Sequence, residues 1–268
     1  MGRNSRSLAM GLTVGLAVLS GRLAFQAGAV EASVGADPGP AVTHVFLLIG
    51  QSNMAGRGRV EAVDLVPHPR VFSFAKDQRW TPAVDPIAFD KPGLAGVGPG
   101  CAFGRAVADA HSDWVVGLVP AAFGGTTLEE WQPGGRLYRD AVDRTRAALL
   151  GGARLAAVLW LQGESETPQT AETYVARFSL MAASLRTDLN SRDVPIIVGE
   201  LGRFVSVAPA MNPQLARLPA AIPNCGMVSS LGLTDKGDSL HFDSASAREL
   251  GRRYARAFDE GWGHAAAR

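Results

Sequence analysis

A serine in a glycine-bounded turn is the first residue of this chain that could perform chemistry. Ser52 stands in the run Gly50-Gln51-Ser52-Asn53-Met54-Ala55-Gly56, directly after an apolar segment. A serine on the turn that leaves a central strand projects its hydroxyl over the sheet edge, where backbone N–H groups are free to bind an oxyanion. Met54 occupies the second glycine position of G-x-S-x-G, which disfavours an α/β-hydrolase nucleophile elbow. The alternative is a polar turn without chemistry, because Gly, Ser and Asn are ordinary turn formers.

A histidine with a nearby carboxylate lies close to the other end of the chain. Asp238 precedes His241 by three residues, just ahead of the last predicted helix. That short spacing lets the carboxylate reach the imidazole ring and fix its tautomer, so His241 is a candidate base for a serine. None of the other four histidines has an adjacent orienting acid in a loop that leads into a helix. The alternative is a histidine that is merely solvated in its loop.

Short apolar runs predict the strands that must position these residues. Continuous runs of the kind found in buried parallel strands occupy residues 44–49, 115–119, 155–161 and 196–201, with a weaker one at 227–231. Helical periodicity separates them, and one apolar face is formed by Tyr174, Phe178, Met181, Leu185 and Leu189. A capping box of Ser246 and Glu249 predicts the start of the last helix, followed by the stripe Leu250, Tyr254 and Ala257.

Strands that alternate with crossover helices predict an α/β fold. We expect a three-layer α/β/α sandwich with a central, mostly parallel, five-stranded sheet, in a single domain over residues 43–262. Residues 56–98 are rich in Pro, Gly and Asp, and we expect them to form an irregular excursion over one end of the sheet. In such open sheets, functional groups gather at the carboxyl ends of the strands.

Composition narrows the possible partners. The chain has 268 residues, of which 47% are hydrophobic, and a formal charge of +1. We therefore expect no nucleic-acid partner, since no phosphate-tracking charge is visible. Cys101 and Cys225 could form one disulfide or remain two buried free thiols. No CxxC or HExxH spacing is present, so we expect neither a metal nor another cofactor.

The N-terminal residues predict export. Residues 1–30 have a short basic start, an apolar run and small residues before a possible cleavage site, which is the pattern of a secretory signal peptide, and residues 31–42 then form a linker. We therefore expect a secreted, extracellular protein with no stable membrane insertion after cleavage. The alternative is an uncleaved anchor, although the apolar run is short for a membrane span of about 20 residues.

Four motifs in order resemble a known family. They are Gly50-Gln51-Ser52-Asn53-Met54, Phe123-Gly124-Gly125-Thr126 with Trp131, Leu159-Trp160-Leu161-Gln162-Gly163-Glu164-Ser165, and Asp238-Ser239-Leu240-His241. Together they resemble the sialate O-acetylesterase-like branch of the SGNH hydrolases, and within it the sixth carbohydrate esterase family, which includes acetylxylan esterases and plant homologues. The similarity extends from about Val45 to Phe258. It implies the flavodoxin-like SGNH hydrolase fold.

The resemblance also implies roles for individual residues. Ser52 would be the nucleophile, His241 the general base and then acid, and Asp238 the orienting carboxylate. The oxyanion would be bound by the backbone N–H groups of Ser52 and Gly124 and by the side-chain amide of Gln162. A glycine allows close backbone approach and a glutamine offers two N–H donors, which agrees with these roles. Alternatively, the Gly124 turn and the Gln162 side chain are purely structural.

Other residues of the motifs leave alternatives open. Glu164 could replace Asp238 as the acid that orients His241, or it could hold the Ser52 turn by hydrogen bonds. Glu166 has no matching role, and we expect a solvated carboxylate. Candidates for binding the substrate are Gln51, Asn53, Gly125 and Trp131. Trp131 could stack on a sugar ring, but packing is the role that its large apolar area favours, and we assign Trp160 to the core.

The predicted function is that of a serine esterase. It would remove O-acetyl or other small acyl groups from carbohydrate, such as acetylated xylan or related glycans, through an acyl-enzyme and without a cofactor. The preference for acetyl is implied by the resemblance alone. One alternative is a general small-acyl esterase or lipase that acts on other esters. Another is a catalytically silent carbohydrate-binding protein on the same scaffold. The oligomeric state is not indicated by the sequence.

Overall fold

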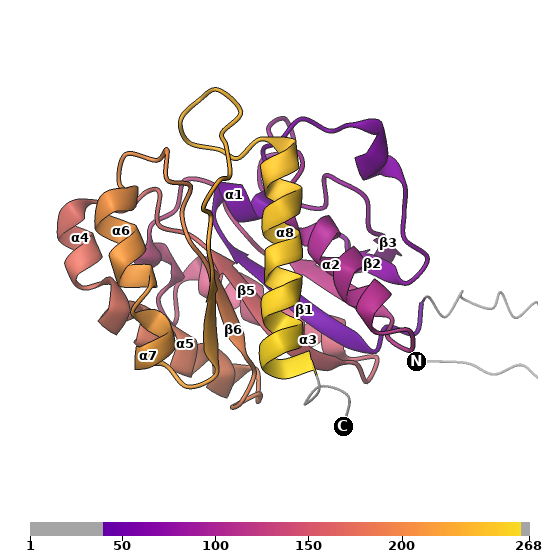
Figure 1. Ribbon diagram of the computed structural model, residues 1–268. Helices are drawn as coiled ribbons and strands as arrows, with labels where there is room; N and C mark the ends of the chain where they lie inside the picture. The colour runs from indigo at the N-terminus through magenta and orange to yellow at the C-terminus, as the bar shows by residue number, and fades with distance from the viewer. Residues whose placement is uncertain (1–39, 264–268) are drawn as a thin grey trace, which may run out of the picture. The chain divides into compact units, whose positions relative to one another are not determined.

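A computed structural model describes residues 40–263, and these residues fold around one sheet. The predicted signal peptide, residues 1–30, and most of the predicted linker lie outside the described residues. The strands are β1 (His44–Gly50), β2 (Val71–Phe74), β3 (Trp80–Pro82), β4 (Val116–Pro120), β5 (Arg154–Leu161), β6 (Ile196–Gly199) and β7 (Cys225–Val228). Their order in the sheet is β3-β2-β4-β1-β5-β6-β7 (Figure 1).

The α/β prediction is confirmed, but the predicted strand number is wrong, since the sheet has seven strands and not five. The five predicted strands correspond to β1, β4, β5, β6 and β7, whose spatial order of 2-1-3-4-5 is that of flavodoxin-like sheets. The two additional strands, β2 and β3, lie inside the region predicted to be irregular. They span four and three residues at one edge of the sheet, too short to produce a readable apolar run. Only β3 pairs antiparallel.

Strand β1 lies between β4 and β5 and pairs in parallel with both. All seven of its residues are buried, as expected for a strand with hydrogen-bonded neighbours on both sides and helices on both faces. The chain leaves its carboxyl end at Gly50, whose φ of 133° suits glycine, and whose missing side chain leaves room for the Leu161 carbonyl of β5. The Ser52 turn therefore begins at the centre of the sheet edge.

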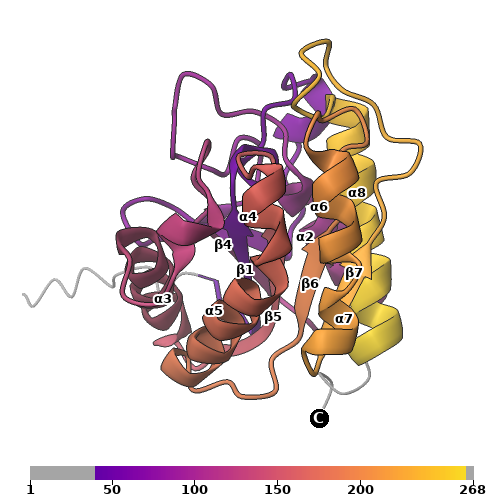
Figure 2. The same ribbon diagram turned by 90° about the vertical axis from the view of Figure 1, so that its left-hand side faces the viewer.

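Helices cover both faces of the sheet (Figures 1 and 2). Helices α2 (Pro99–Ala110) and α8 (Ser244–Phe258) pack together on one face, and α3 (Arg136–Leu149) and α5 (Tyr174–Asp188) cover the other. Shorter helices are α1 (Ser52–Ala55), α4 (Pro168–Glu172), α6 (Ala208–Leu215) and α7 (Leu218–Ala221), with 3-10 turns η1 (Ala62–Leu65) and η2 (Leu128–Trp131) and a π-helical turn η3 (Asp259–Gly263). No helix of the described residues is long and apolar enough to cross a bilayer.

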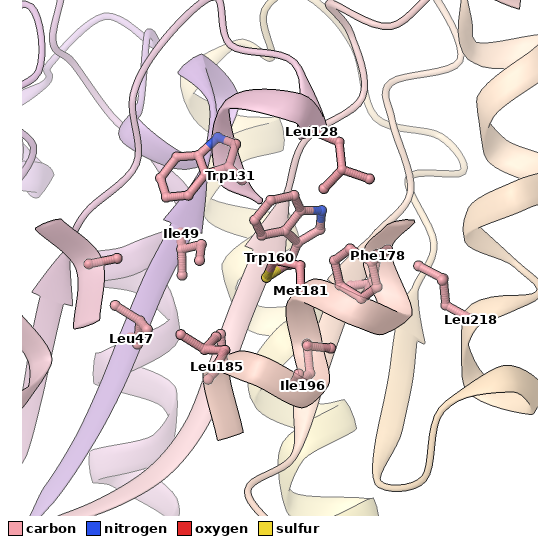
Figure 3. Packing of buried hydrophobic residues seen from close by; sticks show 14 of the residues in the cluster. Leu47, Ile49, Leu128, Trp131, Trp160, Phe178, Met181, Leu185, Ile196 and Leu218 are labelled. Carbon is pink, nitrogen blue, oxygen red and sulfur yellow. The ribbon is translucent and has the colours of Figure 1, made fainter. Parts of the chain in front are cut away.

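The predicted face of α5 is confirmed. Its apolar residues are buried against the sheet, where Phe178 meets Trp160 of β5 in an edge contact with ring centroids 5.2 Å apart (Figure 3). Trp160 is fully buried in this cluster, as predicted. The capping box predicted for the last helix is wrong, because α8 begins earlier, at Ser244. Asp243 is its N-cap and accepts a hydrogen bond from the Ser246 N–H at 2.7 Å.

Both thiols are free. Cys101 belongs to α2 and is buried on the face of the sheet that α2 and α8 cover. Cys225 belongs to β7 and is half-buried. Next to Cys101 lies the Asp85 carboxyl, which is 3% exposed and whose Oδ1 has no hydrogen-bond partner among the described residues. Burial raises the pKa of Asp85 to about 7, and the nearby carboxylate of Asp64 adds to the effect.

This buried carboxyl predicts a pH-dependent stability. Between pH 4 and 7 the folded state binds the Asp85 proton more tightly than the unfolded state does, so the free energy of unfolding falls as the pH rises through this window. We compare the free energy of unfolding of Asp85→Asn with that of the native protein at pH 4 and at pH 8. Between these pH values we expect the difference to shift in favour of the variant by roughly 1–3 kcal/mol. Urea denaturation at the two pH values measures this, with Asp113→Asn, an exposed carboxylate, as the control. An identical pH dependence for Asp85→Asn and native protein would contradict the assignment.

Candidate active site

A hydrogen-bonded chain of serine, histidine and aspartate lies at the carboxyl edge of the sheet. Ser52 is the first residue of α1, and its Oγ is 3.0 Å from His241 Nε2. His241 Nδ1 is 2.7 Å from Asp238 Oδ2, in the loop that leads into α8. With the Nδ1 proton donated to the carboxylate, Nε2 is left to accept the serine proton. The structure therefore brings together the three residues that the sequence singled out, from turns 189 positions apart.

The Asp238 carboxylate is fixed by its own loop. Oδ1 accepts the backbone N–H groups of Leu240 at 3.0 Å and His241 at 2.8 Å. Burial opposes ionisation, but the hydrogen bonds from the backbone and ring of His241 outweigh it and lower the pKa of Asp238 to about 2. Lys236 Nζ lies 3.6 Å from Oδ2 and adds a positive charge. Asp238 is therefore ionised at neutral pH, as an acid that orients an imidazole must be.

Asn53 connects the serine turn to the histidine loop. Its Nδ2 donates to the Leu240 carbonyl at 3.0 Å, and its Oδ1 accepts the Phe242 N–H at 3.0 Å. These two backbone groups flank His241 on either side, so one side chain holds both ends of the segment that carries the imidazole. Asn53 was predicted to bind substrate, but the side chain is buried and its hydrogen-bonding groups are used within the protein, so the geometry favours a positioning role. Asn53 instead sets the separation of Ser52 and His241.

Glu164 lies behind the serine turn and does not contact His241. Its Oε1 accepts the second Nδ2 proton of Asn53 at 2.6 Å, and the backbone N–H groups of Gly163 and Glu164 also donate to the carboxylate. Burial raises the pKa of Glu164, although these hydrogen bonds partly offset the effect. Of the two roles left open for Glu164, the geometry favours support of the Ser52 turn and leaves the histidine to Asp238.

Gln51, also predicted to bind substrate, belongs to the same buried network, and the geometry favours a positioning role for it too. Its side chain is 2% exposed. With its amide nitrogen turned toward them, it donates to the Thr126 carbonyl at 3.1 Å and to Glu164 Oε2 at 3.3 Å. The reverse orientation would place its oxygen 3.4 Å from the N–H groups of Gly163 and Ser165. We prefer the first orientation, since it gives shorter contacts and pairs an N–H with a carboxylate.

The side chain of Gln162 forms all its hydrogen bonds within the protein. It is fully buried, and its Nε2 donates to the Thr126 carbonyl at 3.0 Å and to Glu166 Oε1 at 3.1 Å, while its Oε1 accepts the Tyr174 hydroxyl at 2.7 Å. Both amide protons are therefore bonded within the protein, and this geometry favours the structural alternative for Gln162 over the predicted oxyanion role. It ties the end of β5 to the turn after Gly125 and to α5.

The Gly124 N–H has an unforeseen partner. It donates to Asp90 Oδ2 at 2.9 Å, and the same oxygen accepts Arg57 Nη2 at 2.6 Å. The side chains of Arg57 and Asp90 are 4% and 1% exposed. Gly124 itself approaches the nucleophile closely, because a Cβ placed on it would lie 3.3 Å from Ser52 Cβ. Gly124 therefore lies beside Ser52, where an oxyanion donor would have to lie, but its N–H is bound to a carboxylate that the sequence did not identify.

Glu166 and Trp131 are both buried. The prediction for Glu166 needs correction, whereas Trp131 has the packing role that its large apolar area favoured. Glu166 is not a solvated carboxylate: it is buried and accepts the Leu128 N–H at 2.6 Å, and Arg177 lies 3.3 Å away. Burial opposes its ionisation, but these donors, with Thr170 and Gln162, lower its pKa. Trp131, a candidate for stacking on a sugar, is fully buried. Its ring packs edge-on against Trp160 at 5.7 Å (Figure 3).

Gly125 is the one substrate-binding candidate that lies exposed beside the site, with Lys91 Nζ 3.7 Å from where its Cβ would be.

The sequence analysis did not identify Arg57 and Asp90 as residues of the site. Arg57 directly follows the serine motif, which is a local signal, but nothing in the Pro- and Gly-rich segment around Asp90 marks that residue as its partner. Among residues 40–263, no group of three or more His, Cys, Asp or Glu side chains is arranged to hold a metal ion.

Comparison with known proteins gives the family. Residues 42–260 match the family described as "Carbohydrate esterase, sialic acid-specific acetylesterase". The chain belongs to this family, and the SGNH-type resemblance drawn from its four motifs is confirmed.

Two relatives illustrate the similarity. The chain is 33% identical over 237 residues to the "Probable carbohydrate esterase At4g34215" of Arabidopsis thaliana. The aligned region covers 80% of this chain and 89% of the relative. The crystal structure of the Arabidopsis protein superimposes with a TM-score of 0.77, at 32% identity, over 82% of this chain and 98% of that one. A carbohydrate acetylesterase from Xanthomonas citri shares the fold, with a TM-score of 0.62 at 18% identity, over 82% of this chain and 56% of that one.

The geometry distinguishes the two candidate acids. We expect Asp238→Asn to lower kcat by about 10³–10⁴-fold, because the amide would favour the wrong histidine tautomer. We expect Glu164→Gln to lower kcat by at most about tenfold, because a glutamine oxygen can still accept from Asn53. Ester hydrolysis under saturating substrate measures both, and circular dichroism checks folding. A loss with Glu164→Gln as large as with Asp238→Asn would show that Glu164 orients the base.

The buried Arg57–Asp90 pair predicts a large effect on stability. Asp90→Ala removes the partner of a buried guanidinium and of the Gly124 N–H, so we expect it to lower the free energy of unfolding by about 3–5 kcal/mol. Asp140→Ala is the matched control, because it removes the aspartate of an exposed pair with Arg136, and we expect a change of at most about 1 kcal/mol. Urea denaturation measures both. Equal effects would mean that burial of the first pair has no energetic consequence.

Proposed function

We propose that the protein is a serine esterase that removes O-acetyl groups from carbohydrate through an acyl-enzyme. The observation that carries this proposal is the hydrogen-bonded chain from Ser52 Oγ through the imidazole of His241 to the Asp238 carboxylate, at 3.0 Å and 2.7 Å. This arrangement activates a hydroxyl whose own acidity is too low for it to attack an ester.

In the proposed reaction, His241 Nε2 takes the Ser52 proton as Oγ attacks the acetyl carbonyl. The imidazolium then gives this proton to the departing sugar hydroxyl, which leaves acetyl-Ser52. A water molecule repeats the sequence on the acyl-enzyme: His241 takes one of its protons as the water oxygen adds to the carbonyl. The bond to Ser52 Oγ then breaks, Oγ takes the proton from His241, and acetic acid is released and ionises to acetate. Asp238 stabilises the imidazolium in both halves, since its low pKa keeps it ionised.

The Ser52 N–H is the first proposed donor to the oxyanion, because it lies at the start of α1, where helix N–H groups have no intrahelical partner. The Gly124 N–H is a second proposed donor. It would exchange the Asp90 carboxylate for the oxyanion, and Asp90 would retain Arg57 as its partner. Gln162 has no part in this proposal, since it is fully buried and would have to give up bonds to both Thr126 and Glu166, whereas Gly124 lies against Ser52.

The carbohydrate substrate is supported by family membership and by the Arabidopsis and Xanthomonas proteins, whose names describe carbohydrate esterases. Acetylated xylan is the proposed polysaccharide, on the resemblance of the motifs to the acetylxylan esterase group. Secretion is proposed on residues 1–30 alone.

Replacement of the serine tests the proposal. We expect Ser52→Ala to lower the rate of acetate release by about 10⁴-fold or more while the protein stays folded. Ser112→Ala, at an exposed serine remote from the carboxyl edge, is the matched control and should retain native activity. A fluorophosphonate should add its mass to a peptide that contains Ser52. Turnover by Ser52→Ala at the native rate would remove this residue from the mechanism.

The choice of substrate separates the alternatives. Acetate released from acetylated xylan is compared with hydrolysis of an aryl acetate. Hydrolysis of the aryl acetate alone would indicate a general small-acyl esterase. Binding of xylan without hydrolysis of either ester would indicate a carbohydrate-binding protein on an inactive scaffold.

A further inference from the structure

A cavity of about 300 Å³ lies beside the turn that carries Phe123 and Gly124, and none of Ser52, Asp238 or His241 lines it. It lies between the segment that carries Asp90, the chain leaving β4, and the beginning of α3. Phe89, Pro120 and Phe123 supply much of its apolar wall. Asp90 is common to both places, since it lines this cavity and binds the Gly124 N–H beside the nucleophile. A glycan with one sugar at Ser52 therefore has a neighbouring hollow into which its next unit can extend.

The charged groups of the cavity are mainly cationic. Lys76, Arg136 and Arg144 line it, together with Asp90 and Asp140. The two acids are already paired, Asp90 with the buried Arg57 and Asp140 with Arg136 at 3.1 Å. The Arg136–Asp140 pair is solvent-exposed on both sides, so it contributes little energy and Arg136 can change partner.

Arg144 is a partly buried cation that forms no salt bridge with a carboxylate of the described residues, although the Asp77 carboxylate acts on its charge at longer range. Its guanidinium donates to the carbonyls of Pro120 at 3.0 Å and Ala75 at 2.7 Å, and lies over the Phe89 ring at 4.5 Å. Burial lowers its pKa to about 10, so it remains charged at neutral pH. Carbonyls and an aromatic face stabilise this charge but do not neutralise it. The cavity wall therefore keeps a net positive charge.

The lysines add to the positive charge on and around the cavity. Only three of the chain's 26 basic residues are lysines: Lys76 follows the end of β2, Lys91 lies near Gly125, and Lys236 lies near Asp238. Of these, Lys76 lines the cavity. Lys91 lies 6.0 Å from the Phe123 ring, whose centroid is 5.4 Å from Arg136, and Lys236 approaches Asp238. Neither Lys76 nor Lys91 forms an ion pair with a carboxylate of the described residues.

We propose that this cavity is a subsite for a carboxylated sugar, which binds next to the acetylated unit of an acidic glycan. This proposal rests on the proposed esterase function and specifies its substrate class. The apolar wall contacts a face of the sugar ring, and Lys76 and Lys91, with Arg136, attract the carboxylate. A neutral glycan gains only the first of these interactions. The subsite therefore favours acetylated glycans that carry uronate units over neutral ones.

Two matched substrates test the preference. One is an acetylated neutral xylo-oligosaccharide and the other is the same oligosaccharide with a glucuronate branch. For the native protein we expect kcat/KM to be roughly tenfold higher for the glucuronate substrate at low salt, through a lower KM. We expect this advantage to shrink to about twofold in 0.5 M NaCl, because salt screens exposed charges.

Charge removal tests the residues. We expect the double variant Lys76→Gln/Lys91→Gln to lose most of the advantage, about five- to tenfold in the ratio of the two kcat/KM values, with kcat little changed. Arg192→Gln, an exposed arginine at the opposite edge of the sheet, is the matched control and should keep the native ratio. Equal kcat/KM values for the two substrates in the native protein would overturn the subsite, as would an unchanged ratio in the double variant.

A binding measurement keeps the subsite separate from the chemistry. Calorimetric titration of Ser52→Ala with an unacetylated oligogalacturonide, and separately with sialyllactose, shows whether a carboxylated sugar binds and which kind binds more tightly. We expect binding of at least one to weaken about five- to tenfold when the two lysines are also replaced. No binding of either ligand would overturn the subsite even if the esterase activity is found. Conversely, lysine-dependent binding without ester hydrolysis by native protein would overturn the proposed function alone.

Discussion

The site depends on the fixed separation between the Ser52 turn and the His241 loop. The side chain that bridges them is Asn53, which binds the backbone on both sides of His241 and is itself held by the Glu164 carboxylate. A hydrogen bond between a hydroxyl and an imidazole is useful only within a few tenths of an ångström, and two independent loops would not keep such a distance on their own. One buried amide with all its hydrogen bonds satisfied supplies that constraint.

A buried polar network extends this constraint through the carboxyl edge of the sheet. Gln51 and Gln162 both hydrogen-bond to the Thr126 carbonyl, and Glu166 joins Gln162 to the η2 turn. Each group lies in a low-dielectric environment, where an unpaired polar atom is costly, so the network favours one arrangement of the turns. Motif residues with the chemistry of substrate contacts thus serve to hold the nucleophile in place.

Much of the fold could be predicted from local pattern. Buried parallel strands produce apolar runs, and the helix face of α5 has a period that is readable from its residues. The short edge strands β2 and β3 escaped detection because they bury few residues, and the start of α8 was misplaced because Asp243, and not Ser246, accepts the capping bond. Strand number and helix ends depend on pairing and caps that hydrophobic pattern does not encode.

By itself, the sequence determined which residues could do the chemistry. Residue type alone identifies the serine hydroxyl, the histidine imidazole and the aspartate carboxylate as groups that can do this chemistry. The contact between Asp238 and His241 spans only three residues, so spacing can predict it. Only the tertiary structure decided what the remaining polar groups do. In the folded chain, Asn53 hydrogen-bonds to the His241 loop and the Gly124 N–H donates to Asp90. These partners are far apart in the chain, so their pairing depends on three-dimensional packing.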